Sequence, residues 1–230
     1  MLTRVVEPEL MDFLPPTNPQ AAEARRSLVR VNRLLRHPQR FLYWWGELRA
    51  SQWVRRVVEL GAGDGKVLLL VLARLPRPVF PSKVVLVDRL EVVEPQTCVG
   101  IRALGWEIEV IVGEASEWLE SAQVEPDTLL LANMFLHHFT PEQLRRLFAR
   151  IAPHAHAFLA CEPRRSGFAL AASRFLGLAG CNFVSRYDGT LSVRAGFAGT
   201  ELSRLWPAPG WRLQESKFGL FSHGFTAVRS

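Results

Sequence analysis

Three glycines alternate with other residues in the stretch VVELGAGDG, and carboxylates stand among them. The glycines are Gly61, Gly63 and Gly65. They permit tight turns and let a bound molecule come close to the backbone. Glu59 and Asp64 would repel a phosphate group and would attract a positively charged ligand. The E-x-G-x-G-x-G spacing also differs from the GxGxxG loop of dinucleotide sites, and the chain has no Walker GxxxxGK[ST] motif.

Two further acids follow the next strand-like runs at positions that suit a nucleoside. Asp88 ends the run KVVLVD, 23 residues after Gly65, where a carboxylate can accept both ribose hydroxyls. Glu114, in VGEAS, follows a third run and can accept a hydrogen bond from an adenine amino group. S-adenosylmethionine carries an ammonium and a sulfonium but no phosphate. The set of acids therefore favours S-adenosylmethionine over NAD or ATP.

Two histidines and one carboxylate are candidate groups for proton transfer. His137 and His138 lie in FLHHF, after the run LLLAN, and Glu162 lies in CEPRR, after another apolar run. A neutral imidazole can take the proton from an acceptor hydroxyl near pH 7. Because adjacent side chains diverge, we expect one histidine to act as the base, and His137 is favoured over His138. Glu162 is expected to orient that histidine or to hold the acceptor.

Strand-like and helix-like patterns alternate between residues 56 and 163. Buried strands are predicted over 56–60, 82–88, 106–113, 127–134 and 155–163. Helices are predicted over 66–75, 95–105 and 116–122, the last with Ser116 as its N-cap, and another begins with the capping box of Thr140, Pro141 and Gln143. This alternation predicts a doubly wound, mostly parallel α/β sheet, whose carboxyl ends gather the acids and histidines at one edge. The runs over 210–220 and 221–230 predict an antiparallel C-terminal hairpin that completes a seven-stranded sheet.

The remaining segments are expected to cover that edge of the sheet. Residues 1–20 are rich in proline and are expected to be irregular, and helices are predicted over 21–35 and 40–56. A helix is predicted over 166–182, followed by a long connection over 185–197. The aromatic residues of these segments, including Trp44 and Trp45, either suit a flat, apolar acceptor or pack the helices onto the sheet.

Four motifs, in this order, resemble those of class I S-adenosylmethionine-dependent methyltransferases: VVELGAGDG, VVLVDR, IVGEASEWL and LLLANMFLHHF. The resemblance covers roughly residues 55–163 and the closing hairpin. It implies that Glu59 and the glycines surround the methionine moiety, Asp88 holds the ribose and Glu114 contacts adenine, although an aspartate is more usual at this last position. The implied cofactor-binding residues are Glu59, Gly61, Ala62, Gly63, Gly65, Asp88, Arg89, Glu114, Ala115, Asn133, Met134 and Phe135.

The resemblance also implies a domain organisation. Residues 1–54 are expected to form a helical N-terminal cap, and residues 55–230 the methyltransferase domain, with a cap-like insertion at about 164–208.

The expected acceptor is a small aromatic or polyketide-like molecule that is methylated at oxygen. Histidines after the fourth strand are similar to those of small-molecule O-methyltransferases, and NMFLHHF and ACEPRRS loosely resemble bacterial methyltransferases of polyketide and phenolic-lipid pathways. The Asn/Asp-Pro-Pro-Tyr/Phe motif of amino-directed nucleic-acid methyltransferases is absent. The fourth strand is not followed by a cluster of acids, so no metal site is predicted there. Cys161 is expected to be a buried strand residue and not a nucleophile.

The composition keeps two alternatives open. A net charge of +6 and a pI of about 9.9 would suit an RNA- or protein-directed methyltransferase, although the arginines are dispersed and nucleic acid is not the expected partner. A non-catalytic binding module with the same fold is the other alternative. Three cysteines without a CxxC pair, no signal peptide and no apolar run of membrane-spanning length predict a soluble, cytoplasmic protein. A homodimer is left open.

Overall fold

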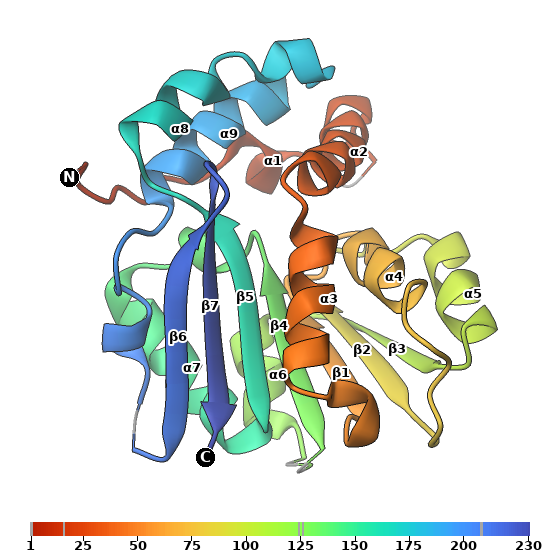
Figure 1. Ribbon diagram of the computed structural model, residues 1–230. Coiled ribbons are helices and arrows are strands. Elements are labelled where there is room, and N and C mark those ends of the chain that lie inside the picture. The colour runs from red at the N-terminus through yellow and green to blue at the C-terminus, as the bar shows by residue number, and fades with distance from the viewer. Residues whose placement is uncertain (1, 16, 124, 126, 208) are drawn as a thin grey trace.

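The computed structural model describes residues 2–15, 17–123, 125, 127–207 and 209–230. Its centre is a seven-stranded sheet with the order β3-β2-β1-β4-β5-β7-β6 (Figure 1). The strands are β1 (Arg56–Leu60), β2 (Lys83–Asp88), β3 (Glu107–Val112), β4 (Thr128–Asn133), β5 (Ala157–Pro163), β6 (Trp211–Phe218) and β7 (Ser222–Arg229). Strands β1 to β5 are parallel, and the hairpin of β6 and β7 joins β5 in antiparallel fashion. The predicted fold class is therefore confirmed.

The sheet is covered on both faces, which explains the continuous apolar runs of its central strands. The helices α3 (His37–Glu47), α4 (Lys66–Leu72) and α5 (Pro95–Ala103) pack on one face. The helices α6 (Ala115–Ser121) and α7 (Pro141–His154) pack on the other. The N-terminus of α7 has the predicted capping box, in which Thr140 and Gln143 satisfy each other's backbone N–H groups.

A cap of helices lies beyond the carboxyl ends of the parallel strands (Figure 1). It consists of α1 (Leu10–Phe13), α2 (Pro19–Leu34), α8 (Gly167–Ser173), the short 3-10 helix η3 (Leu176–Ala179) and α9 (Phe183–Ala195). Segments far apart in sequence meet here: Asn182 Nδ2 donates to Gln20 O at 2.9 Å, and Val5 N donates to Arg194 O at 3.2 Å. The division of the chain at residues 54, 164 and 208 stays a prediction.

Five details of the predicted elements are wrong. The helix predicted over 166–182 ends at Ser173 and is followed by the separate 3-10 helix η3. Residues 185–197 are not a long connection, because α9 runs through most of them and its buried face includes the polar Asp188 and Ser192. The helix predicted over 40–56 ends at Glu47. Ser116 is not an N-cap, since α6 begins one residue earlier, after Glu114. The segment expected to be irregular over 1–20 contains α1.

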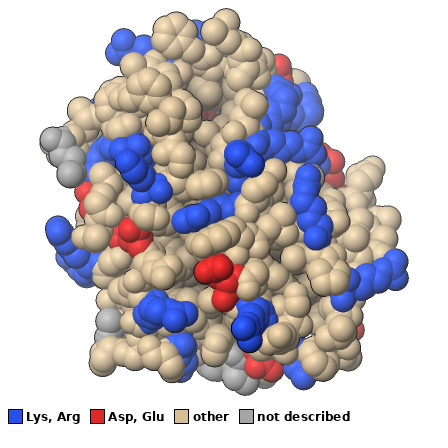
Figure 2. Space-filling view, viewed as in Figure 1, with Lys and Arg blue, Asp and Glu red and all other residues tan. Residues whose placement is uncertain are grey.

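The surface charge matches the dispersed pattern in the sequence. Figure 2 shows Lys and Arg side chains scattered over the face of the molecule on which α3, β6 and β7 lie. None of the helices described is long and apolar enough to cross a membrane.

Candidate active site at the carboxyl ends of β1 and β4

A cavity of about 510 Å³ lies between the carboxyl edge of the sheet and the N-terminal part of the cap. Strand β1 lies between β2 and β4, so the crossover connections diverge at the β1–β4 pair. Ligands of doubly wound sheets bind outside the carboxyl ends of such strands. Every implied cofactor residue except Gly65 lines the cavity: Glu59, Gly61, Ala62, Gly63, Asp88, Arg89, Glu114, Ala115, Asn133, Met134 and Phe135.

The glycine loop follows β1, and two of its glycines are required by close packing. All three have positive φ, at which a side chain is strained. A Cβ on Gly61 would lie 2.2 Å from the Phe135 ring, and one on Gly65 would lie 2.7 Å from a Leu86 methyl group. Gly63 has open space around it. Gly65 therefore lets the loop pack closely against β2, while Gly61 and Gly63 line the cavity.

Glu59 is the feature that points most directly to a cationic ligand. Its side chain is 3% exposed, and its Oε2 has no hydrogen-bond partner among the residues described. Burial, with smaller contributions from the nearby Asp64 and Asp88 charges, raises the pKa of Glu59 to about 8. A buried carboxyl with an unused oxygen on a cavity wall is suited to an ammonium group.

Asp88 is held at the edge of the cavity by two backbone groups. Its Oδ2 accepts a hydrogen bond from Gly63 N at 2.8 Å, and its Oδ1 accepts one from Leu90 N at 2.9 Å. Each carboxylate oxygen keeps a second lone pair for a hydroxyl donor. The next residue, Arg89, forms an ion pair with Asp12 of α1 and so ties the N-terminal segment to this loop.

Asn133 and Met134 continue the wall at the end of β4. Asn133 Oδ1 lies 2.8 Å from His37 Nδ1, and Asn133 Nδ2 donates to Asn32 Oδ1 at 3.1 Å. Burial lowers the pKa of His37 to about 4, so its neutral ring accepts at Nε2 from the Ser222 hydroxyl at 2.7 Å. Met134 has a φ of 54°, an uncommon conformation for a residue with a side chain.

His137 lies between two carboxylates. Its Nδ1 is 2.8 Å from Glu162 Oε2, and its Nε2 is 3.4 Å from Glu9 Oε1. Burial alone would lower the pKa of His137, but the interactions with Glu162 and Glu9 outweigh burial and raise that pKa to about 9. At neutral pH the ring is therefore an imidazolium, with both nitrogens engaged and no proton-accepting atom.

His138 has a different environment and lines the cavity. Its ring centroid lies 4.2 Å from that of His137, with the two planes tilted by 33°. Burial, followed by the positive charge on His137, lowers the pKa of His138 below its ordinary value. The neutral ring of His138 is thus available at the cavity under conditions in which His137 is protonated.

Glu162 is buried beneath the loop that carries the histidines and does not line the cavity described. Its Oε1 accepts from Phe135 N at 3.0 Å and Leu136 N at 2.8 Å, and its Oε2 accepts from His137 N at 3.3 Å. These bonds, with the pair to His137, lower the pKa of Glu162 although burial opposes this. Of the two expected roles, the geometry agrees with orienting a histidine.

Glu9, His137 and His138 offer ligand atoms within 4.8 Å of one another. A metal ion there would have to replace the proton that His137 shares with the carboxylates. The sequence predicts no metal here, and it does not single out Glu9, because that residue lies 128 residues before His137.

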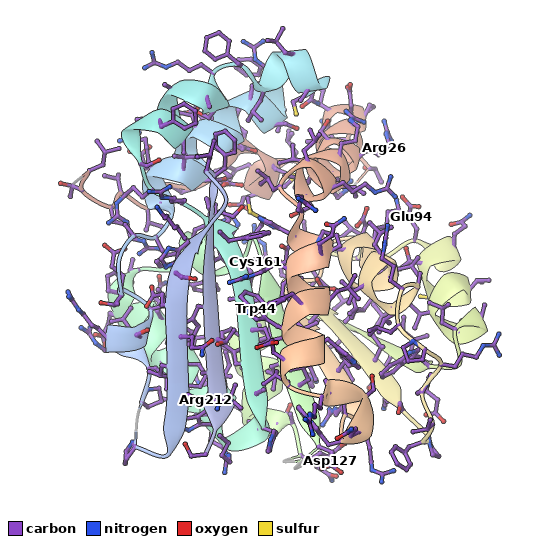
Figure 3. The ribbon with its side chains drawn as sticks, in the orientation of Figure 1. Arg26, Trp44, Glu94, Asp127, Cys161 and Arg212 are labelled. Atoms are coloured by element: carbon purple, nitrogen blue, oxygen red, sulfur yellow. The ribbon has the colours of Figure 1, made fainter. Side chains whose placement is uncertain are left out.

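The aromatic residues divide between the core and the cavity. Trp44 and Trp45 are buried in the core under α3, and Figure 3 shows Trp44 on the side of α3 that faces the sheet. Cys161 is fully buried in β5, and burial raises the pKa of its thiol. Phe135 and Phe139 line the cavity, with ring centroids 4.9 Å apart. The aromatic part of the cavity wall thus comes from the loop after β4.

No protein-family model matches this chain, and no curated protein matches its sequence. Several solved structures match its fold. An O-methyltransferase family protein from Burkholderia thailandensis is 18% identical, with a TM-score of 0.58. That match covers 92% of this chain and 63% of the other, so this chain spans less than two thirds of that protein.

Two further structures were determined with a cofactor or its product. The plantazolicin methyltransferase BamL, in complex with S-adenosylhomocysteine and a triazolic desmethylPZN analog, is 11% identical with a TM-score of 0.62, over 93% of this chain and 92% of that one. Magnesium protoporphyrin IX methyltransferase from Synechocystis PCC 6803, with bound S-adenosylmethionine, is 12% identical with a TM-score of 0.55, over 96% and 88%. The fold of this chain is that of the class I methyltransferases.

Proposed function

We propose that this protein is an S-adenosylmethionine-dependent methyltransferase that methylates a hydroxyl group of a small, apolar acceptor. One observation carries the proposal: the buried carboxyl of Glu59, with an unused oxygen, lies on the same cavity wall as Asp88. An ammonium and a ribose in one ligand would satisfy both. The structures of BamL with S-adenosylhomocysteine and of the protoporphyrin enzyme with S-adenosylmethionine support this choice of cofactor.

The residues of the cavity suit each part of the cofactor. Glu59 would bind the ammonium and Asp88 the ribose hydroxyls, while Glu114 stands at the adenine end with Ala115. Arg25 of α2 lines the same cavity and supplies positive charge for the carboxylate of the methionine moiety. When bound, S-adenosylmethionine supplies an electrophilic methyl group.

We assign the base to His138 in place of His137. His138 lines the cavity and stays neutral, so it can take the hydroxyl proton as the acceptor oxygen gains the methyl group. His137 acts as a positioning residue: its charge, held by Glu9 and Glu162, lowers the pKa of the neighbouring ring. Phe135 and Phe139 would contact an aromatic acceptor.

The test is methyl transfer to a panel of phenols and quinols, followed by mass spectrometry, beside binding of S-adenosylhomocysteine by the same preparation. We expect methylation of at least one phenol and an increase of about 14 mass units, because a methyl group replaces the hydroxyl hydrogen. Binding of S-adenosylhomocysteine without turnover on any acceptor would contradict the catalytic part of the proposal and favour a binding module. Transfer to RNA alone would contradict the proposed acceptor class.

A further inference from the structure

The cap exposes several large apolar side chains. Five of them are called here the crown patch: Phe168 on α8, Phe175 between α8 and η3, Leu178 on η3, and Phe183 and Tyr187 on α9. Leu178 is 89% exposed, and the three phenylalanines are each at least 60% exposed. Apolar side chains gathered on one surface mark a site of interaction more often than scattered ones do.

The charged residues in the segment that carries the crown patch are almost all basic. Between Arg164 and Thr200 the chain contains five arginines, no lysine and one acid, Asp188. Asp188 is buried and accepts hydrogen bonds from two backbone N–H groups of α1, so it does not neutralise the surface. Arg174 and Arg186 are exposed beside the apolar side chains. In Figure 2 the upper end of the molecule is mostly uncharged, with more basic than acidic side chains at its borders.

A second, basic cavity of about 520 Å³ adjoins the start of α8. Its lining includes Arg164, Ser166, Lys217 and His223. Among the residues described, the side chains of Arg164 and Lys217 have no ion-pair or hydrogen-bond partner. Phe168, two residues after Ser166, stacks on Phe221 with ring centroids 5.6 Å apart. A cationic hollow and exposed aromatic rings therefore lie next to each other.

We propose that the crown patch and this basic cavity dock the protein on the surface of an anionic lipid bilayer. The apolar side chains would enter the boundary between headgroups and acyl chains, where such groups leave water. Arg164, Lys217 and Arg174 would contact lipid phosphates, whose attraction falls with salt. The proposal goes beyond the proposed function and does not depend on it, because docking involves no methyl transfer.

Two other occupants fit the surface less well. In a two-fold dimer the same surface of both copies would meet, so the arginines that flank the patch on one copy would lie near those on the other and repel them. RNA would pair with the arginines and could stack on the phenylalanines, but it would leave Leu178 exposed to water.

The test is co-sedimentation of the full chain with vesicles of phosphatidylcholine alone and with one third phosphatidylglycerol. We expect binding to the anionic vesicles that weakens at high salt, and at least tenfold weaker binding to the neutral ones. The double variant Phe175→Glu, Leu178→Glu should lose at least tenfold in vesicle affinity. A matched variant, Val79→Glu, Val99→Glu, replaces two other exposed apolar residues away from the cap and should bind as the unaltered chain does.

Melting temperature and binding of S-adenosylhomocysteine show whether each variant is folded, and they also separate a failure of this proposal from a failure of the proposed function. Equal vesicle binding by the crown variant and its matched control would overturn the proposal. So would a dimer that the crown variant abolishes, or binding to RNA with none to vesicles. A reduced preference for anionic vesicles in Arg164→Gln, Lys217→Gln would support it.

Discussion

At the scale of single residues, burial of Glu59 links its protonation to folding. Its pKa is about 8 in the folded chain and near 4.5 in the unfolded chain, so the folded state holds a proton that the unfolded state loses between these values. The free energy of unfolding therefore falls as pH rises from 4.5 to 8. As pH rises from 5 to 8, we expect the free energy of unfolding of Glu59→Gln to increase by about 1–3 kcal/mol relative to that of the unaltered chain, measured by urea denaturation. A difference that does not change with pH would contradict the buried, protonated state.

The two histidines are predicted to respond differently to substitution. His138→Ala should leave the affinity for S-adenosylhomocysteine nearly unchanged and reduce turnover by about 10²–10⁴-fold, because a general base is lost. Steady-state kinetics and a binding titration on one preparation check this. Equal loss of binding and turnover would contradict the assignment of His138 as base.

His137 is predicted to matter first for stability. Removing its ring leaves Glu162 as a buried charge without its partner, so His137→Ala should lower the free energy of unfolding by about 3–5 kcal/mol. Because its pKa is raised from 6.5 to about 9, its contribution is fully present below pH 6.5 and is lost as pH rises through 9. A chemical-denaturation series from pH 6 to pH 9.5 measures both effects. A variant as stable as the unaltered chain at pH 6 would be inconsistent with the buried ion pair.

At the scale of elements, the junction between α9 and β5 depends on one glycine. A Cβ on Gly196 would lie 2.3 Å from the backbone oxygen of Pro163, which cannot move away as a flexible side chain can. Gly196→Ala should therefore lower the free energy of unfolding by about 1–3 kcal/mol. Gly167, at the start of α8, has nothing within 4 Å of such a Cβ, so Gly167→Ala is the matched control and should be neutral or slightly stabilising. Thermal melts of the two variants compare them, and equal melting temperatures would contradict this packing.

The sequence predicts well those elements whose local signals are strong. The strand Arg56–Leu60 and the helix that begins at Pro141 carry strong local signals, a buried apolar run and a capping box, and both are found where expected. The helix α9 is missed because Asp188 and Ser192 lie on its buried face, where they bond to α1 and Glu9 and interrupt the apolar periodicity.

In the candidate site, too, the sequence predicts the residues of local motifs but not those that tertiary packing brings in. Glu59, Asp88 and the glycines follow from a local motif, and they line or support one cavity. Glu9, Asn32 and His37 reach that edge only through the packing of the N-terminal segment, which no spacing in the sequence encodes. The sequence favours His137 over His138 as the base, and only this packing reverses the choice, because Glu9 and Glu162 engage both nitrogens of His137.

At the scale of the whole molecule, the N-terminal segment that lines the cavity also connects distant parts of the chain. Arg4 donates to Phe139 O at 2.9 Å and to Ala195 O at 2.7 Å, and so joins the N-terminal segment to the histidine loop and α9. A ligand that binds between the N-terminal segment and the histidine loop stabilises both of them. At about one hundred times its Kd, S-adenosylhomocysteine should raise the melting temperature by about 5–10 °C, while NAD and ATP should not. Asp88→Ala should reduce that shift, and a similar shift with all three ligands would argue against a specific cofactor site.

The central claim is that the carboxyl of Glu59 binds the cationic end of the cofactor, and proton release on binding tests it most directly. Calorimetric titration with S-adenosylhomocysteine at pH 7, in phosphate and in Tris, separates the heat of binding from the heat of buffer protonation. With a pKa of about 8, Glu59 is mostly protonated at pH 7 and must lose its proton to pair with the ammonium. The account predicts release of about one proton per ligand from the unaltered chain and none from Glu59→Gln. Identical heats in the two buffers for the unaltered chain, or no binding by folded protein, would contradict it.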